Sequence, residues 1–136
     1  MLLLSRDVTA EKMASGCRDQ IPIWCGGFSE PMFRRAVAHG DGFIFGHGLN
    51  DAAMEAWVRV RELLAEAGRP VEGFGAQFLM HPDEGPYSDE ETVEGAHRLA
   101  EAGATDCSLY TMERGFTEVE QHIEYFTSMR EKLPGR

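Results

Sequence analysis

The chain has 136 residues, 43% of them hydrophobic and 26% charged, a composition typical of one folded domain rather than of a disordered chain. Its formal net charge of −10 argues against nucleic acid or an anionic membrane surface as the main partner. The three cysteines show no Cys-x-x-Cys spacing, which favours reduced thiols in a cytoplasmic protein over a disulfide framework or a zinc site.

Residues 1–20 show no clear period and form a segment of their own, in which one helix is expected from Thr9 to Gly16. The sequence opens with MLLLSRD, an apolar run too short for a signal peptide or a membrane-spanning helix. From residue 21 to residue 136 the sequence predicts a single domain.

Four short apolar runs in this domain are predicted as strands. They are nearly continuous in apolar character, as strands covered on both faces are. The predicted strands are Ile21–Cys25, Phe43–Phe45, Phe74–Met80 and Asp106–Thr111.

Each predicted strand is followed by a segment in which apolar residues recur every three or four positions, the period of a helix. The helices are expected at Ser29–His39, at Asp51–Ala67 with Trp57 in the core, from Ser88 to Gly103, and from Thr117 onward. Capping boxes are predicted for the last two, Ser88 with Glu91 and Thr117 with Glu120. The last helix is expected to bury Val119, Ile123, Phe126, Met129 and Leu133.

Strands separated by helices of this length need crossover connections, so parallel pairing and right-handed crossovers are expected. The chain is therefore predicted to be an α/β protein of four βα units. Such a (βα)4 unit is half of a (β/α)8 barrel, which typically has about 250 residues. A flat, doubly wound sheet of the flavodoxin type is the competing fold.

The stretch CGGFSE, residues 25–30, lies where the first predicted strand passes into the first predicted helix. One interpretation is a plain turn, in which glycines supply unusual backbone angles and Ser29 caps the helix. The other is an anion site, because Gly26 and Gly27 would let backbone amides approach a phosphate beside the helix N-terminus. The stretch has neither the lysine of a Walker loop nor a Gly-x-Gly-x-x-Gly pattern, so the pattern alone leaves both interpretations open.

The longer stretch IPIWCGGFSEPMFRRAVAHGDGF resembles the luciferase-like monooxygenase family, flavin- or deazaflavin-dependent oxidoreductases built on a (β/α)8 barrel. Phe43 stands where that family usually has tryptophan. The order of the later elements also fits, so the resemblance covers residues 20–133 and corresponds to the C-terminal half of the family's barrel. The matching residues are Pro22, Trp24, Gly26, Gly27, Ser29, Arg34, Arg35, Ala36, Asp41 and Gly42.

The resemblance implies FMN or a deazaflavin coenzyme as cofactor and a small molecule as substrate. It makes Gly26, Gly27, Phe28 and Ser29 the candidates for the cofactor's phosphate site, and it gives Asp41–Gly42 a structural role at the opposite end of the strands. The family's first four strands, which supply most proposed catalytic side chains, have no counterpart in these residues. We therefore assign no catalytic residue and no metal site.

Other polar residues follow the ends of predicted strands, where the loops of a barrel carry its function. His47 follows the second strand and Arg114 the fourth, so both are candidates for contact with a substrate or a phosphate, against the alternative of solvated loop side chains. Cys25 and Cys107 lie within strands and are expected to be small buried thiols without a catalytic role.

Two function classes remain at this point: the C-terminal portion of a flavin- or deazaflavin-dependent oxidoreductase, or a non-catalytic module that keeps only the half-barrel. A half-barrel has two open strand edges, which invite pairing with another chain. Either a homodimer or a complementary N-terminal half-barrel chain is therefore expected. The apolar strand residues expected to need such cover are Ile23, Phe43, Phe45, Phe78 and Leu109.

Overall fold

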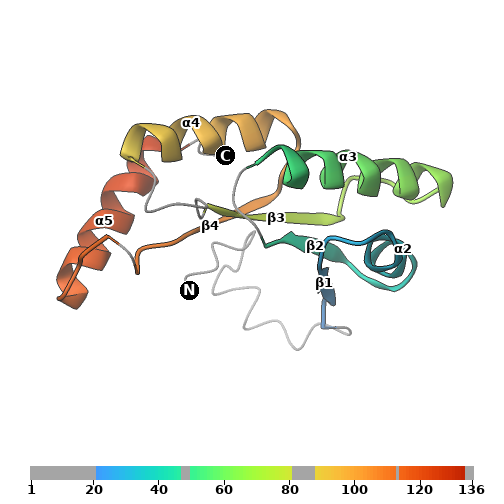
Figure 1. The fold of residues 1–136 in the computed structure, drawn as a ribbon, viewed down its shortest axis with the longest axis horizontal. Coiled ribbons are helices and arrows are strands. Elements are labelled where there is room, and N and C mark those ends of the chain that lie inside the picture. The colour runs from blue at the N-terminus through green and yellow to red at the C-terminus, as the bar shows by residue number, and fades with distance from the viewer. Residues whose placement is uncertain (1–20, 47–49, 81–87, 113, 134–136) are drawn as a thin grey trace, which may run out of the picture.

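The computed structural model describes residues 21–46, 50–80, 88–112 and 114–133, in which four strands alternate with four helices (Figure 1). The helix expected at Thr9–Gly16 lies outside these residues. None of the helices in the described ranges is long and apolar enough to cross a lipid bilayer. In chain order the elements are β1 (Trp24–Gly26), α2 (Glu30–His39), β2 (Gly42–Phe45), α3 (Asp51–Glu66), β3 (Gly75–Met80), α4 (Asp89–Glu101), β4 (Asp106–Leu109) and α5 (Val119–Lys132).

The four strands form one parallel sheet in the order β1-β2-β3-β4, so each strand lies beside the next one in the chain. A flavodoxin-type sheet instead places its strands in the order 2-1-3-4-5, with a reversal of direction along the sheet. The sequential order is that of consecutive units of a (β/α)8 barrel. The predicted (βα)4 arrangement is thus confirmed.

A short return joins α2 to β2 at the N-terminal ends of the strands. The backbone N–H of Asp41 donates to the carbonyl oxygen of Ile23 at 2.7 Å, and a carboxylate oxygen of Asp41 accepts from the backbone N–H of Ile23 at 2.8 Å. Asp41 therefore fastens the start of β1 to the start of β2, which is the structural role expected for it.

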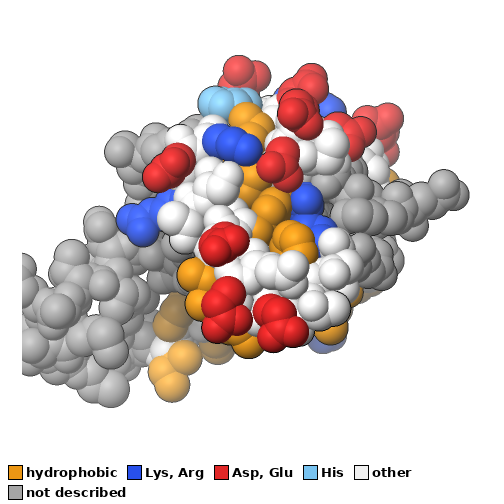
Figure 2. All heavy atoms as spheres, turned by 90° about the vertical axis from the view of Figure 1, so that its left-hand side faces the viewer, with side chains coloured by type: hydrophobic (Ala, Val, Ile, Leu, Met, Phe, Trp, Pro, Cys, Tyr) orange, Lys and Arg blue, Asp and Glu red, His pale blue; other side chains and the backbone are white. Residues whose placement is uncertain are grey.

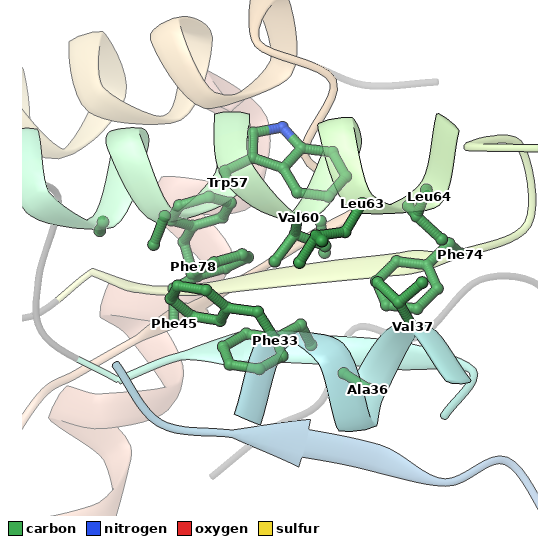
Figure 3. Close-up of a cluster of buried hydrophobic side chains, with 14 of the residues drawn as sticks. Phe33, Ala36, Val37, Phe45, Trp57, Val60, Leu63, Leu64, Phe74 and Phe78 are labelled. Atoms are coloured by element: carbon green, nitrogen blue, oxygen red, sulfur yellow. The ribbon is translucent and has the colours of Figure 1, made fainter. Parts of the chain in front are cut away.

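The core lies between the sheet and the helices α2 and α3 (Figure 3). Phe45 stacks on Phe78 with ring centroids 4.5 Å apart, and the buried Trp57 of α3 meets Phe45 edge-on. The Trp57 indole N–H donates to the carbonyl oxygen of Ala102 at 2.8 Å, which ties α3 to the end of α4. Since burial of one such ring contributes about 1.5–3 kcal/mol, this cluster is the main source of stability.

The expectation that the apolar strand residues need a partner's cover is wrong for three of them. Phe43, Phe45 and Phe78 are fully buried by the chain's own helices. The reason is that alternate residues of a strand point to opposite faces, and these three point to the helix side. The sequence alone did not tell which face that was.

The other face of the sheet, which would line the inside of a barrel, is more polar. The Gln77 amide on β3 donates to the hydroxyl group of Ser108 on β4, and both side chains are buried. On β1, the Trp24 ring lies across two glycines, Gly42 and Gly75, that are aligned with it on β2 and β3. A Cβ atom at either glycine would collide with this ring.

The last helix departs from two expectations. Its capping box is formed by Glu118 and Gln121 rather than by Thr117 and Glu120, because the Gln121 amide oxygen accepts the backbone N–H groups of both Thr117 and Glu118. Of the five residues expected to be buried on α5, only Met129 is, and Val119 and Ile123 are well exposed. In Figure 1, α5 stands at the end of the sheet beyond β4.

Candidate functional site

Because the strands are parallel, their C-terminal ends share one edge of the sheet. The turn from β1 into α2 and the segment after β4 both leave the sheet at this edge. In barrels of this kind the functional groups sit at that edge. His47 lies outside the described residues.

The turn from β1 to α2 contains two glycines, and Gly27 sits where a side chain would be unfavourable. Gly27 has φ of 134°, a backbone conformation that other residues rarely adopt, and an added Cβ would come within 3.2 Å of the Met32 Cγ atom. A Cβ on Gly26 would lie 3.4 Å from the carbonyl oxygen of Ile44 on the neighbouring strand. Gly26 and Gly27 therefore place no side chain of their own over the backbone of this turn.

Ser29 occupies the N-cap position of α2, as predicted, but its hydroxyl group makes no capping hydrogen bond. Its carbonyl oxygen instead accepts the N–H groups of Met32 and Phe33 at 2.9 and 3.1 Å. Ser29 is exposed, and so is Phe28 beside it on the same turn. The helix thus leaves the serine hydroxyl available to bind a ligand at its positively polarised end.

The charges near this turn are balanced by a cluster that joins α2 to α3. Glu30, in the first turn of α2, accepts two bonds from Arg59 at 2.8 and 3.0 Å and pairs with Arg34 at 2.7 Å. The Arg59 guanidinium, with Arg34, lowers the pKa of Glu30, and the bonds to Glu30, Glu62 and Glu66 raise the pKa of Arg59. An anion at the turn would consequently approach a carboxylate that two arginines already neutralise.

Arg114 is placed far from the β1–α2 turn, since β1 and β4 are the two outermost strands of the sheet. Its guanidinium lies over the Tyr125 ring, 4.1 Å from the centroid, and pairs with Asp89 at 3.3 Å. The side chain is 14% exposed. Burial is the main cause that raises the pKa of Tyr125. Arg114 therefore takes part in the junction of α4 with α5, and the structure does not bring it together with Gly26–Ser29.

The two described thiols lie on the helix side of the sheet, away from its inner face. Cys25 pairs in register with the outward-facing Phe43, and Cys107 pairs in register with Phe78. Burial, and then the neighbouring Asp106 carboxylate, raise the pKa of Cys107, so its thiol stays protonated at neutral pH. A protonated, half-buried thiol is a poor nucleophile, in agreement with the packing role expected.

One feature of the inner face was not predicted from the sequence. Trp24 belongs to the motif that carried the family resemblance, yet its position across Gly42 and Gly75 was not foreseen. The signal was present as glycines at the start of two strands, where a missing side chain often marks close approach by another group. In the described part of the chain, no group of three or more His, Cys, Asp or Glu side chains could hold a metal ion.

The chain was also compared with known proteins. A family model described as luciferase-like monooxygenase matches residues 5–120, a stretch that includes the β1–α2 turn and all four strands. No curated protein matches the chain.

Proposed function

The chain belongs to the luciferase-like monooxygenase family, and on that premise we propose that it is the part of a flavin- or deazaflavin-dependent oxidoreductase that holds the phosphate end of the cofactor. The observation that carries this proposal is the turn Gly26–Ser29 at the C-terminal edge of the sheet. It combines a bare backbone, an uncommitted hydroxyl group and a helix N-terminus.

The residues of the turn suit a phosphate group. Gly26 and Gly27 allow backbone amides to approach it closely, Ser29 offers a hydroxyl donor, and the helix N-terminus adds partial positive charge. The bound FMN or deazaflavin supplies the redox chemistry, and the substrate is a small organic molecule. The residues of this chain bind and orient the phosphate end, and no proton-transfer role is assigned to them.

The binding experiment compares two glycine variants of the whole chain. Gly27→Ala places a methyl group on the turn, and we expect it to weaken cofactor binding about tenfold, or ~1.4 kcal/mol. Gly103→Ala is the matched control, because Gly103 also has a positive φ, 86°, and its added Cβ would meet no atom within 4 Å. Both variants should lose about 1 kcal/mol of folding stability from backbone strain. Only Gly27→Ala should lose affinity.

The measurement is a fluorescence titration with FMN and with a deazaflavin coenzyme, in parallel with urea unfolding. Equal affinities of the two folded variants would contradict the phosphate role of the turn. If the parent chain binds neither cofactor, the non-catalytic module becomes the better interpretation and the glycines serve the turn alone.

A further inference from the structure

Exposed apolar side chains gather at the two open ends of the sheet. At the β1 end, Ile21 and Ile23 are 85% and 59% exposed. At the β4 end, Met112, Val119 and Ile123 are 77%, 68% and 58% exposed. Within the described residues, no strand pairs with the outer edge of β1 or of β4. Both ends therefore present apolar side chains next to unpaired backbone, the combination that favours strand addition.

The β4 end also contains an apolar groove of about 240 Å³ between β4 and α5. Figure 2 looks onto this side of the molecule and shows a band of apolar side chains with acidic and basic side chains around it. The groove lies on the helix side of the sheet, where Cys107 and Leu109 of β4 point. Its lining residues are Cys107, Leu109, Ile123, Phe126, Thr127, Arg130 and Leu133.

One side of α5 packs against α4, and the groove lies along another side of the same helix. Met129 is fully buried, the His122 ring is bonded to the Thr111 hydroxyl at 2.8 Å, and Lys132 pairs with Asp89 at 3.3 Å. With α5 held in this way, Ile123 lines the groove together with Cys107 and Leu109 of β4. The groove thus lies at the outermost strand of the sheet.

We infer that a second copy of this chain fills this place, with the edge of its β1 alongside β4 of the first copy. Ile21 and Ile23 are exposed in the three residues that lead into β1, at the edge of the sheet that this strand forms. In the second copy these side chains would enter the groove of the first. One joint of this kind uses the β1 edge of one copy and the β4 edge of the other, so a twofold pair forms two identical joints. Two four-stranded sheets joined in this way close into eight strands with no open edge.

The charges at the two ends are complementary. On α2, Arg35 and His39 lie on the side turned away from α3, since Glu30 and Arg34 occupy the side that faces Arg59. On α5, Glu120, Glu124 and Glu131 lie on the side turned away from α4 and make no ion pair within the described residues. Closure places α5 of one copy beside α2 of the other, so acidic side chains meet basic ones. This favours pairing of a β1 end with a β4 end over pairing of two β1 ends or two β4 ends. The net charge of −10 opposes most other contacts between two copies of the chain.

The decisive experiment mixes two variants of the full chain and follows association by sedimentation. Ile23→Lys alters only the β1 side of the joint, and Ile123→Glu alters only the groove side. Each variant alone carries two damaged joints, and we expect its dissociation constant to rise about a hundredfold, roughly tenfold for each joint. In a mixed pair one joint is intact, and the other carries both substitutions. The mixture should therefore associate within about tenfold of the parent chain.

Val58→Glu is the matched control, because Val58 is 45% exposed on α3, away from both ends of the sheet, and should leave association unchanged. Circular dichroism of each variant shows whether it is folded, and the exposure of both isoleucines predicts that it is. A parent chain that sediments as a monomer at micromolar concentration would overturn the inference. That is the result expected if a different half-barrel chain or residues 1–20 cover the groove. A mixture that associates no better than either variant alone would overturn it too, since a joint of like ends gives that result. Neither result bears on cofactor binding, which is measured separately.

Discussion

Two serines precede helices in this chain, and their hydroxyl groups do different things. Ser88 accepts the backbone N–H of Glu91 at 3.1 Å, while the Glu91 carboxylate accepts the backbone N–H of Ser88 at 2.8 Å, and these bonds lower the pKa of Glu91. Ser29 has the same position before α2 without the side-chain bond. Both caps were visible in the sequence, but the direction of a hydroxyl group depends on neighbours that a sequence pattern does not contain.

This difference gives a prediction at the level of single residues. Ser88→Ala should lower the free energy of unfolding by about 1 kcal/mol, the usual effect of losing an N-cap. Ser29→Ala should lower it by less than half as much, because no capping bond is lost. Urea unfolding of both variants measures the two values. Equal losses would mean that the Ser29 hydroxyl does cap α2, and it would then be unavailable to a ligand.

At the level of elements, β1, β2 and β3 are held together on the inner face by the Trp24 ring. Gly75→Ala should destabilise the fold by about 1–3 kcal/mol, since the new methyl group overlaps the ring. Trp24→Leu should remove most of this penalty, so the double variant should be more stable than the sum of the two single effects predicts.

Gly42→Ala is the control for this prediction. Its Cβ would meet the Trp24 Cδ2 atom at 2.8 Å but also the carbonyl oxygen of Gly75 at 2.9 Å. Trp24→Leu cannot relieve the second contact, so the Gly42→Ala penalty should persist in the double variant. A rescue of both glycine variants would show that the strands shift apart instead.

The ion cluster between α2 and α3 gives the molecule an acid-sensitive contact. The pKa of Glu30 is lowered from its ordinary value of 4.5, chiefly by its bond with Arg59. A carboxylate with a lowered pKa contributes stability that is complete above its ordinary value and is lost as the pH falls through the folded-state value. We therefore expect the melting temperature of the parent chain to fall below pH 4.5, and Glu30→Gln to make this fall shallower.

Glu101→Gln serves as the matched charge control, because Glu101 is exposed and makes no ion pair within the described residues. The measurement is the melting temperature as a function of pH for the three proteins. If Glu30→Gln and Glu101→Gln change the fall of the melting temperature at acidic pH equally, the effect comes from the net charge and not from the α2–α3 cluster.

At the level of the whole molecule, the alternation of periods in the sequence predicted the (βα)4 arrangement, because strand and helix patterns arise from local geometry. Trp57 was correctly placed in the core, since its helix repeats apolar residues on one face. The burial of α5 was predicted wrongly for a physical reason. An apolar stripe shows that a helix side needs cover, but it does not say whether the cover comes from the same chain. For the site, the pattern located the β1–α2 turn but did not reveal that Arg114 lies at the other end of the sheet.

The sequential order of the strands has a consequence for how the chain acquires its structure. Each strand docks beside the one synthesised just before it, so the loops that must close are short and the entropy lost in closing them is small. The described units can therefore join the sheet one after another, each through contacts that are short in sequence. Of the four described helices, α5 has the fewest buried residues, Met129 alone. Docking of α5 thus gains the least buried apolar surface, and we expect this helix to be the element that detaches most easily from the folded chain.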